Sequence, residues 1–357
     1  MKYLSEYRDK KLAKKILHLI REKIRGNWKI MEVCGGQAWT IINYGIDKLL
    51  PRKITLVHGP GCPVCVTPVE IIDKAIALAK MEEVILCSYS DMLRVPGSEK
   101  DLLTAKSEGA DIRVVYSPLD VIKIAKQNPL KKIVFFAIGF ETTVPGNAVT
   151  LEIAEIKSIN NVYLLVSQLR IPPALELILA SSSIHGLLAP GHVCTIMGYK
   201  EYEEIANKYE VPIVVTGFEP IDLLEGILIL IEALENKEIK VFNQYKRSVK
   251  RNGNLEAKSI IDKFFEIKDQ EWRGLGLIPR SGFYLREEYK KYNAENLLKS
   301  EIKSKEKSLC IAGEILQGIK KPTECKAYRK LCTPSRPLGA PMVSAEGICA
   351  AYYNSGR

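Results

Sequence analysis

Short apolar runs alternate with longer amphipathic segments through the first part of the chain. The runs have the length and β-branched content of buried strands, and they are Lys29–Val33, Ile54–Val57, Val84–Cys87, Ile112–Tyr116 and Ile133–Ala137. Segments with helical spacing of apolar positions separate them, for example Pro68–Met81. This alternation predicts βα units, and therefore a parallel sheet with helices on both faces.

The same alternation begins again beyond residue 150. Strand-like runs at Val162–Val166, Gly186–Leu188 and Ile213–Thr216 are separated by helical patterns at Pro173–Ser181 and Tyr199–Tyr209. We therefore predict an α/β protein with two parallel-sheet lobes, one over residues 1–150 and the second over residues 151–240.

The pattern changes after residue 240. Two charged segments with helical spacing, Val241–Lys268 and Glu287–Lys303, flank a glycine-rich stretch, and the tail beyond them has several prolines and few apolar runs. Such a tail cannot build a large core of its own, so a bound metal is the natural way to order it. Residues 241–357 are predicted to form a third region, mainly helical and irregular, that carries cysteine ligands.

Composition narrows the class of protein. Of the 357 residues, 46% are hydrophobic and 26% are charged, which is ordinary for a soluble globular protein. The net charge of +10 is spread along predicted surface helices without interleaved aromatic residues, which disfavours a nucleic-acid role. No apolar run approaches the roughly 20 residues of a membrane span, and no secretory signal is evident, so we expect a cytoplasmic protein.

Nine cysteines need an explanation in that compartment, because structural disulfides are rare there. Four of them lie in the tail, separated by fourteen, six and sixteen residues: Cys310, Cys325, Cys332 and Cys349. With no nearby histidine, they suit an iron–sulfur cluster or a four-cysteine zinc site, and spacing alone leaves the two nearly level. The alternative is a set of buried thiols without a ligand.

Three further cysteines follow the first two predicted strands. The stretch HGPGCPVCVTP places Cys62 and Cys65 in a rigid turn, which is a moderately specific redox signal, whereas a zinc half-site would need a second pair. Cys34 stands at a strand-to-helix turn before Gly35 and Gly36, where backbone amides can stabilise a thiolate. Its alternative is a small buried residue behind a tight turn.

A polar loop follows the strand Ile133–Ala137. Its residues Glu141, Thr142 and Thr143 stand at a carboxyl strand end, where open α/β sheets bind ligands. The alternative is a helix cap in which Thr142 or Thr143 accepts hydrogen bonds from backbone amides. Elsewhere in the chain, Cys194 and His192 are further candidates for a functional site.

Eight stretches together resemble one family, the hydrogenase maturation protein HypD. They are MEVCGG, HGPGCPVCVTP, DMLRVPGS, IGFETT, PGHV, VVTGFEPIDLLEGI, WRGLGLIPRSG and CTPSRPLGAPMVSAEGICAAYY, in this order over essentially the whole chain. The resemblance implies two α/β lobes and a third region with a 4Fe–4S cluster. It also implies a scaffold for the Fe(CN)2CO unit of nickel–iron hydrogenases, a redox-active assembly protein rather than a conventional turnover enzyme.

The resemblance further implies a role for each group of site residues. Cys34 would hold the transient iron, shared with a cysteine of a partner, and Cys62 and Cys65 would be a redox dithiol that relays electrons from the cluster. The cluster ligands would be Cys310, Cys325, Cys332 and Cys349, and the candidate catalytic residues include Glu141, Thr142 and Thr143. The implied partners are the small chaperone HypC and the cyanide donor HypE, met transiently by a monomer.

The chain departs from the family motif CGGHTH. It reads Cys34-Gly-Gly-Gln-Ala-Trp39, so both histidines are missing, and a further family histidine appears here as Gln168. Glutamine cannot titrate, and Trp39 offers a single N–H donor. Two other functions therefore stand beside the scaffold: a paralogous thiol–disulfide or iron–sulfur electron-transfer protein that serves another target, and a zinc-stabilised binding module.

Overall fold

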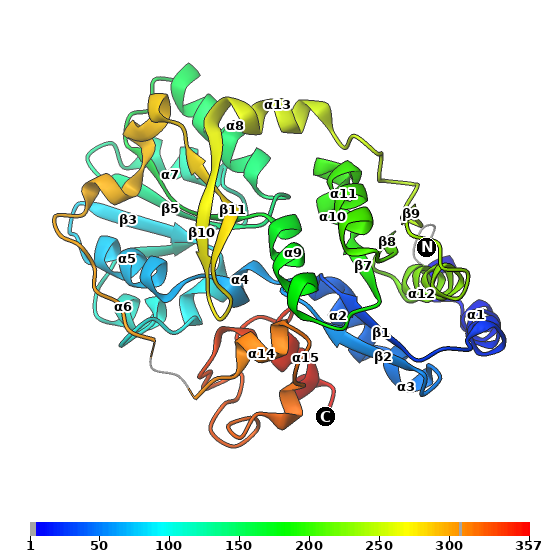
Figure 1. Cartoon of the computed structure of the whole chain (residues 1–357). Helices are drawn as coiled ribbons and strands as arrows, with labels where there is room; N and C mark the ends of the chain where they lie inside the picture. Colours follow the sequence, from blue (N-terminus) through cyan, green and yellow to red (C-terminus); the bar gives the residue numbers. More distant parts are fainter. Residues whose placement is uncertain (1–4, 307–308) are drawn as a thin grey trace.

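The computed structural model describes residues 5–306 and 309–357, and it shows two α/β lobes side by side with a tail beneath them (Figure 1). The first lobe is built on a five-stranded sheet in which all neighbours are parallel, in the order β2-β1-β7-β8-β9. Its strands are β1 (Trp28–Glu32), β2 (Ile54–His58), β7 (Gly186–Pro190), β8 (Ile213–Thr216) and β9 (Val241–Asn243).

The second lobe is built on a six-stranded mixed sheet in the order β10-β11-β6-β5-β3-β4. Strands β3 to β6 pair in parallel, and the antiparallel hairpin β10–β11 adds to β6. The strands are β3 (Val84–Ser88), β4 (Ile112–Val114), β5 (Lys132–Gly139), β6 (Val162–Leu169), β10 (Phe265–Trp272) and β11 (Gly276–Leu285).

Helices lie over both sheets (Figure 1). Those of the first lobe are α1 (Lys10–Lys23), α2 (Gly35–Asn43), α3 (Ile46–Leu49), α9 (Ile171–Ser181), α10 (Gly191–Met197), α11 (Lys200–Tyr209) and α12 (Pro220–Glu235). Those of the second lobe are α5 (Val69–Ala79), α6 (Leu102–Ser107), α7 (Asp120–Gln127), α8 (Val144–Ile156) and α13 (Leu255–Phe264), and α4 (Pro63–Val66) lies between the lobes. The tail carries α14 (Ala312–Leu316) and α15 (Ile348–Asn354), and the 3-10 turns are η1 (Glu6–Arg8), η2 (Ser90–Arg94), η3 (Glu287–Tyr292), η4 (Ala294–Leu297), η5 (Pro322–Glu324) and η6 (Ala340–Met342).

The predicted α/β class is confirmed, and a strand stands at each of the eight predicted positions. The expected division at residues 150 and 240 does not coincide with the sheets. Strand β1 pairs with β7, where Ile30 is the partner of Gly186. The first lobe therefore combines β1 and β2, which precede β3–β6 of the second lobe in the sequence, with β7–β9, which follow them. The chain thus passes between the lobes after β2, after β6 and after β9.

The segment after residue 240 differs from the prediction. The predicted helix Val241–Lys268 is wrong, because this stretch holds β9, α13 and the start of β10. Strand β10 reads as a helix because its central residues Ile267–Asp269 are all exposed, so the alternation of buried and exposed positions typical of a strand is broken. In the turn of its hairpin, Gly274 and Gly276 both have φ of +81°, a conformation that favours glycine. The predicted helix Glu287–Lys303 is instead the two short turns η3 and η4.

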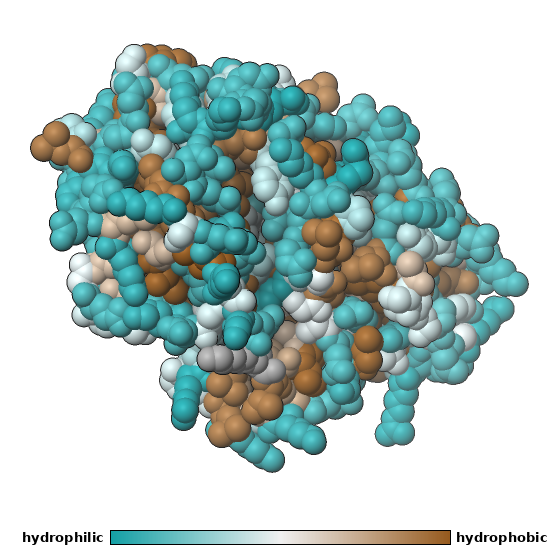
Figure 2. Space-filling model, turned by 60° about the vertical axis from the view of Figure 1, so that its left-hand side comes forward, coloured by the Kyte–Doolittle hydropathy of each residue, from teal (hydrophilic) through white to brown (hydrophobic). Residues whose placement is uncertain are grey.

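The tail is ordered by packing against both lobes. Ile315, Met342 and Ile348 join the apolar core around α1, α2 and β1, whereas Val343 joins the core between α5 and β3. Large apolar side chains of the tail that the lobes do not cover stay exposed, such as Leu309 and Ile319. Figure 2 shows one face of the molecule, on which hydrophilic residues predominate and hydrophobic residues form separate groups.

No helix in residues 5–306 or 309–357 combines the length and the apolar character needed to cross a membrane.

Candidate functional site

The loops that follow β1 and β2 meet at the carboxyl edge of the first sheet. The two strands are parallel neighbours, so the residues after them lie side by side. The N–H of Gly35 donates to the carbonyl of Gly61 at 2.9 Å. A Cβ atom at position 61 would lie 2.3 Å from the backbone nitrogen of Cys34, so only glycine fits this approach.

This contact brings three predicted site residues together. Cys34, Cys62 and Cys65 line one narrow cavity of about 10 Å³, enough for about one water molecule. All three thiols are buried and none is in a disulfide. Burial, with the neighbouring Cys62, raises the pKa of Cys65 well above its ordinary value. The thiol of Cys65 is therefore protonated at neutral pH, and its oxidation must release a proton.

Cys34 also faces a second, larger pocket of about 340 Å³. Trp39 of α2 and Tyr44, the residue after it, line this pocket and are 41% and 40% exposed, so they mark its mouth. Glu346 of the tail lines both the pocket and the narrow cavity, as Cys34 does. The Cys34 thiol therefore lies between a space open to solvent and the dithiol.

Burial governs the electrostatics at Cys34. It raises the pKa of the Cys34 thiol strongly, and the carboxylates of Glu32 and Glu346 add to the shift. Nδ1 of His192, in α10, lies 3.7 Å from the sulfur atom of Cys34. Burial lowers the pKa of His192 to about 4, so this imidazole is neutral at physiological pH.

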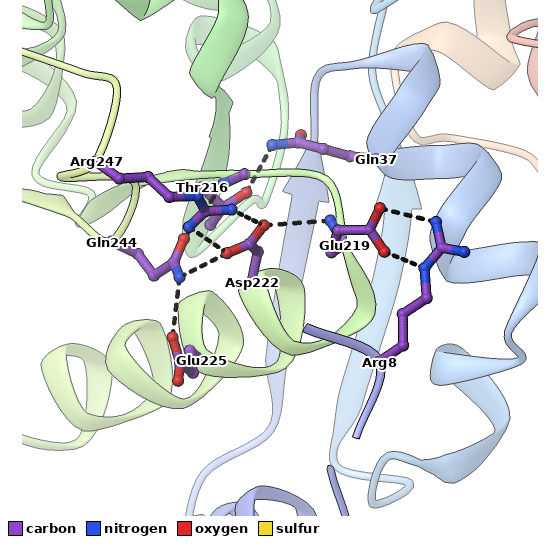
Figure 3. A network of polar contacts seen from close by, with 9 residues as sticks. Arg8, Gln37, Thr216, Glu219, Asp222, Glu225, Gln244 and Arg247 are labelled. Atoms are coloured by element: carbon purple, nitrogen blue, oxygen red, sulfur yellow. Dashed lines mark hydrogen bonds and ion pairs between the residues drawn. The ribbon is translucent and has the colours of Figure 1, made fainter. Parts of the chain in front are cut away.

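Gln37, which stands where the family motif has a histidine, is fully buried and joins α2 to the sheet (Figure 3). Its Nε2 donates to the carbonyl of Ala189 at 3.1 Å and to Oγ1 of Thr216 at 2.7 Å. The amide donors are thus engaged with β7 and β8. Gln37 therefore fixes α2 against the sheet beside the pocket and offers no titratable group.

A polar network continues from there along the start of α12 (Figure 3). The buried carboxylate of Asp222 accepts two hydrogen bonds from Arg247, at 2.8 and 2.6 Å, and one from Gln244 at 3.0 Å. Glu219, the residue before α12, accepts two hydrogen bonds from Arg8 at the wall of the pocket. The motif GFEPIDLLEGI therefore fixes this side of the pocket.

The polar loop after β5 lines neither the pocket nor the narrow cavity. Oε1 of Glu141 accepts the N–H of Ile171 at 2.8 Å, and burial raises the pKa of Glu141 to about 7. Thr143 precedes α8, but its side chain accepts no capping bond; its hydroxyl instead donates to Oε1 of Gln168 at 2.8 Å. Glu141, Thr142 and Thr143 stay predictions as site residues.

The four tail cysteines lie near one another. Burial raises the pKa of Cys349 well above its ordinary value, and the charges of Cys310, Cys332 and Cys325 add to the shift. The N–H of Leu338 donates to the sulfur of Cys332 at 3.3 Å, and a Cβ atom at Gly339 would lie 2.3 Å from the sulfur of Cys310. In the described ranges, however, no three His, Cys, Asp or Glu side chains converge closely enough to hold one metal ion.

Sequence reasoning missed Glu346 and gave His192 little weight. Neither has a local signal, because each reaches Cys34 from a distant segment: Glu346 from the tail and His192 from α10, which follows β7. The proximity of β7 to β1 would have pointed to His192.

Comparison with known proteins identifies the family of this chain. A family model described as "HypD: Hydrogenase formation hypA family" matches residues 10–356. The hydrogenase maturation factor HypD2 of Bradyrhizobium diazoefficiens is 45% identical over 370 residues, covering 100% of this chain and 97% of the relative. HypD of Escherichia coli is 41% identical, covering 99% and 98%, and a putative hydrogenase expression/formation protein of Methanocaldococcus jannaschii is 45% identical, covering 98% of each chain. The chain therefore belongs to the HypD family, and its role is in hydrogenase formation.

Proposed function

We propose that the chain is the scaffold on which the Fe(CN)2CO unit of nickel–iron hydrogenase is assembled, with the iron cargo held at Cys34. The observation that carries this proposal is the position of Cys34 between the open pocket and the dithiol cavity. A cargo and a partner's cysteine can approach from the pocket side. A thiolate is the soft ligand that suits low-spin iron, and iron binding would displace the proton that burial keeps on Cys34.

Cys62 and Cys65 are the redox dithiol in this proposal. Their conversion to a disulfide forms one S–S bond and releases two electrons and two protons, and reduction reverses both. Glu346 is the titratable side chain at the wall between this cavity and the open pocket, and burial raises its pKa. Glu346 therefore suits the exchange of those protons with the pocket.

Cys310, Cys325, Cys332 and Cys349 would hold a 4Fe–4S cluster, which supplies single electrons when it is bound. Each thiolate of such a site binds a different iron atom, so the sulfurs stand farther apart than the ligands of one ion. What supports one shared site is that the four thiols are close enough to influence one another electrostatically. Gly339 leaves room at Cys310, and the amide of Leu338 supports the sulfur of Cys332.

The proposed partners, HypC and HypE, would dock at the mouth of the pocket. Arg8, Trp39 and Tyr44 stand there, and arginine, tryptophan and tyrosine are the residues that most often dominate binding energy at interfaces. Trp39 replaces the second motif histidine, so this chain presents an apolar face where the family has an imidazole.

A paralogous electron-transfer function is the second candidate, and the missing motif histidines favour it. At Cys34 the nearby imidazole is His192 rather than a residue of α2. This function would use the dithiol and the cluster but would not need Cys34.

One experiment separates the two functions. We would record the infrared spectrum of the full chain purified without oxygen from its native host, and count iron and sulfide in the same sample. The scaffold predicts bands of metal-bound cyanide and carbon monoxide that Cys34→Ala removes and that the control Cys194→Ala keeps. Equal iron and sulfide without those bands would instead support the paralogue, and a colourless protein with zinc would support a binding module.

A further inference from the structure

A chain of buried polar side chains runs from Cys34 to the C-terminal helix. It consists of Glu32, His58 and Tyr352, which are 1%, 5% and 5% exposed. Oε1 of Glu32 lies 2.7 Å from Nδ1 of His58, and Nε2 of His58 lies 3.4 Å from the hydroxyl oxygen of Tyr352. Since a carboxylate only accepts, Nδ1–H of His58 donates to Glu32, and for a neutral imidazole the Tyr352 hydroxyl donates to Nε2.

At one end, this chain holds the backbone of Cys34. The second carboxylate oxygen of Glu32 accepts the N–H of Cys34 at 2.8 Å. Glu32 and His58 are also direct partners in the register of β1 and β2, at the last position of each strand. The orientation of the Glu32 carboxylate therefore depends on His58, and the position of the Cys34 backbone depends on that carboxylate.

At the other end, the chain reaches the tail. Tyr352 lies in α15, three residues after Cys349, and its ring packs edge-on against His58 at 5.7 Å between centroids. The Arg357 side chain lies over the same ring and pairs with Asp47. Burial raises the pKa of Tyr352 to about 12, so its hydroxyl stays a donor at neutral pH.

We propose that His58 and Tyr352 are positioning residues for Cys34, that they act through the Glu32 carboxylate, and that they couple Cys34 to the helix carrying Cys349. A buried carboxylate is costly unless its oxygens keep their donors. If α15 shifts and Tyr352 moves away from His58, the imidazole loses a hydrogen-bond partner and can reorient. The Glu32 carboxylate then reorients with it, and its hydrogen bond to the N–H of Cys34 weakens. The inference rests on the proposed function only for which ligands Cys34 and Cys349 bind.

The test reads the Cys34 thiol directly and does not depend on cargo. The full chain is produced without partner proteins and purified without oxygen, its iron is counted, and iodoacetamide labelling of each cysteine is followed by peptide mass spectrometry. Tyr352→Phe removes one oxygen and keeps the ring. We expect it to speed labelling of Cys34 about three- to tenfold, the effect of one lost hydrogen bond. The matched control Tyr353→Phe makes the same change at the next position of α15, and it should leave that rate unchanged.

Three comparisons keep the result specific. Cys87 and Cys194, buried elsewhere, serve as internal references and should label equally in all variants. His58→Asn keeps a donor toward Glu32 and should preserve slow labelling better than His58→Leu, which a purely packing role would not predict. Removing iron with a chelator should change Cys34 labelling in the wild-type chain more than in Tyr352→Phe.

Equal Cys34 rates in Tyr352→Phe and Tyr353→Phe would overturn the inference, as would a matching rise at Cys87 and Cys194. Failure of the scaffold function would appear separately, as the absence of the infrared bands, and would leave these rates unaffected.

Discussion

The imidazole of His192 and the thiol of Cys34 face each other across 3.7 Å, between Nδ1 and Sγ, although 158 residues separate them in the chain. His192 also packs against Phe218, with 5.3 Å between ring centroids. In a chain without the motif histidines, this neutral imidazole is the one that shares the pocket with the Cys34 thiol among the described residues.

The first prediction concerns acid stability at His192. Its pKa is about 4 in the folded protein against an ordinary 6.5, because burial disfavours the charged form. The unfolded chain therefore takes up a proton between pH 6.5 and 4 that the folded chain does not, and the free energy of unfolding falls as the pH is lowered through this window. We expect His192→Gln to reduce this fall by about 1–3 kcal/mol, measured by urea denaturation at several pH values. His18→Gln, on the exposed face of α1, is the matched histidine-to-glutamine control.

Glu141 gives the opposite dependence. Burial raises its pKa from 4.5 to about 7, so the folded chain keeps a proton in this window that the unfolded chain has lost. The free energy of unfolding should therefore fall as the pH rises from 4.5 to 7. Glu141→Gln keeps an acceptor for the Ile171 amide and should be more stable than the wild-type chain at pH 8, by about 1–3 kcal/mol. Equal stability of the two chains at pH 8 would contradict a raised pKa for the buried Glu141 carboxyl.

Two glycines near Cys34 should respond differently to the same change. In Gly61→Ala the new Cβ atom meets the Cys34 backbone at 2.3 Å, whereas in Gly36→Ala it meets the Phe218 ring at 3.4 Å. We expect Gly61→Ala to push the CPVC loop away from Cys34 and to cost about 1–3 kcal/mol of stability. Gly36→Ala should be nearly neutral. Thermal unfolding and the rate at which an oxidant closes the Cys62–Cys65 disulfide would both be measured, and a normal rate in Gly61→Ala would argue against a loop fixed by this contact.

Asp222 should be the most sensitive member of the network beside the pocket. It is fully buried and accepts two hydrogen bonds from Arg247, so Asp222→Ala removes both of these bonds, whereas Gln244 keeps Glu225 as an acceptor. We expect a loss of about 2–4 kcal/mol in the free energy of unfolding. The nearby Glu225 accepts a single bond from Gln244, and Glu225→Ala should cost less than half as much. Similar losses in the two variants would show that the Arg247 pair adds little.

The strands could be predicted from the sequence because parallel strands buried on both faces read as unbroken β-branched and aromatic runs. Strand β5, buried from Ile133 to Gly139, is the clearest case. Strand β10 could not, because the three consecutive residues Ile267–Asp269 are exposed, which breaks the alternation of a strand, and the charges of Lys268 and Asp269 resemble those of a surface helix. Strand pairing was also out of reach, since a local pattern does not say that β1 will lie beside β7.

The residues of the candidate site likewise fall into those that have a local signal in the sequence and those that do not. Cys34, Cys62 and Cys65 could be found because glycines, prolines and thiol spacing mark them locally. Glu346 and Tyr352 could not, because each is brought to the site by packing of a distant segment; Tyr352 meets His58 across 294 residues. His192 could be named only as a candidate beside Cys194, because its approach to Cys34 depends on the pairing of β7 with β1. Their residue types alone carry no signal.

The interleaved strand order has a consequence for synthesis on the ribosome. Strands β1 and β2 emerge first, yet β1 gains its second neighbour only after residue 186, and β9 closes the sheet after residue 241. The parallel core of the second sheet, β3 to β6, is complete by residue 169. The nascent chain must therefore carry an unfinished pair of strands, with an open edge, through the synthesis of more than a hundred residues. Cys34, Cys62 and Cys65 lie on this early segment, so these three thiols stay exposed until the later strands enclose them.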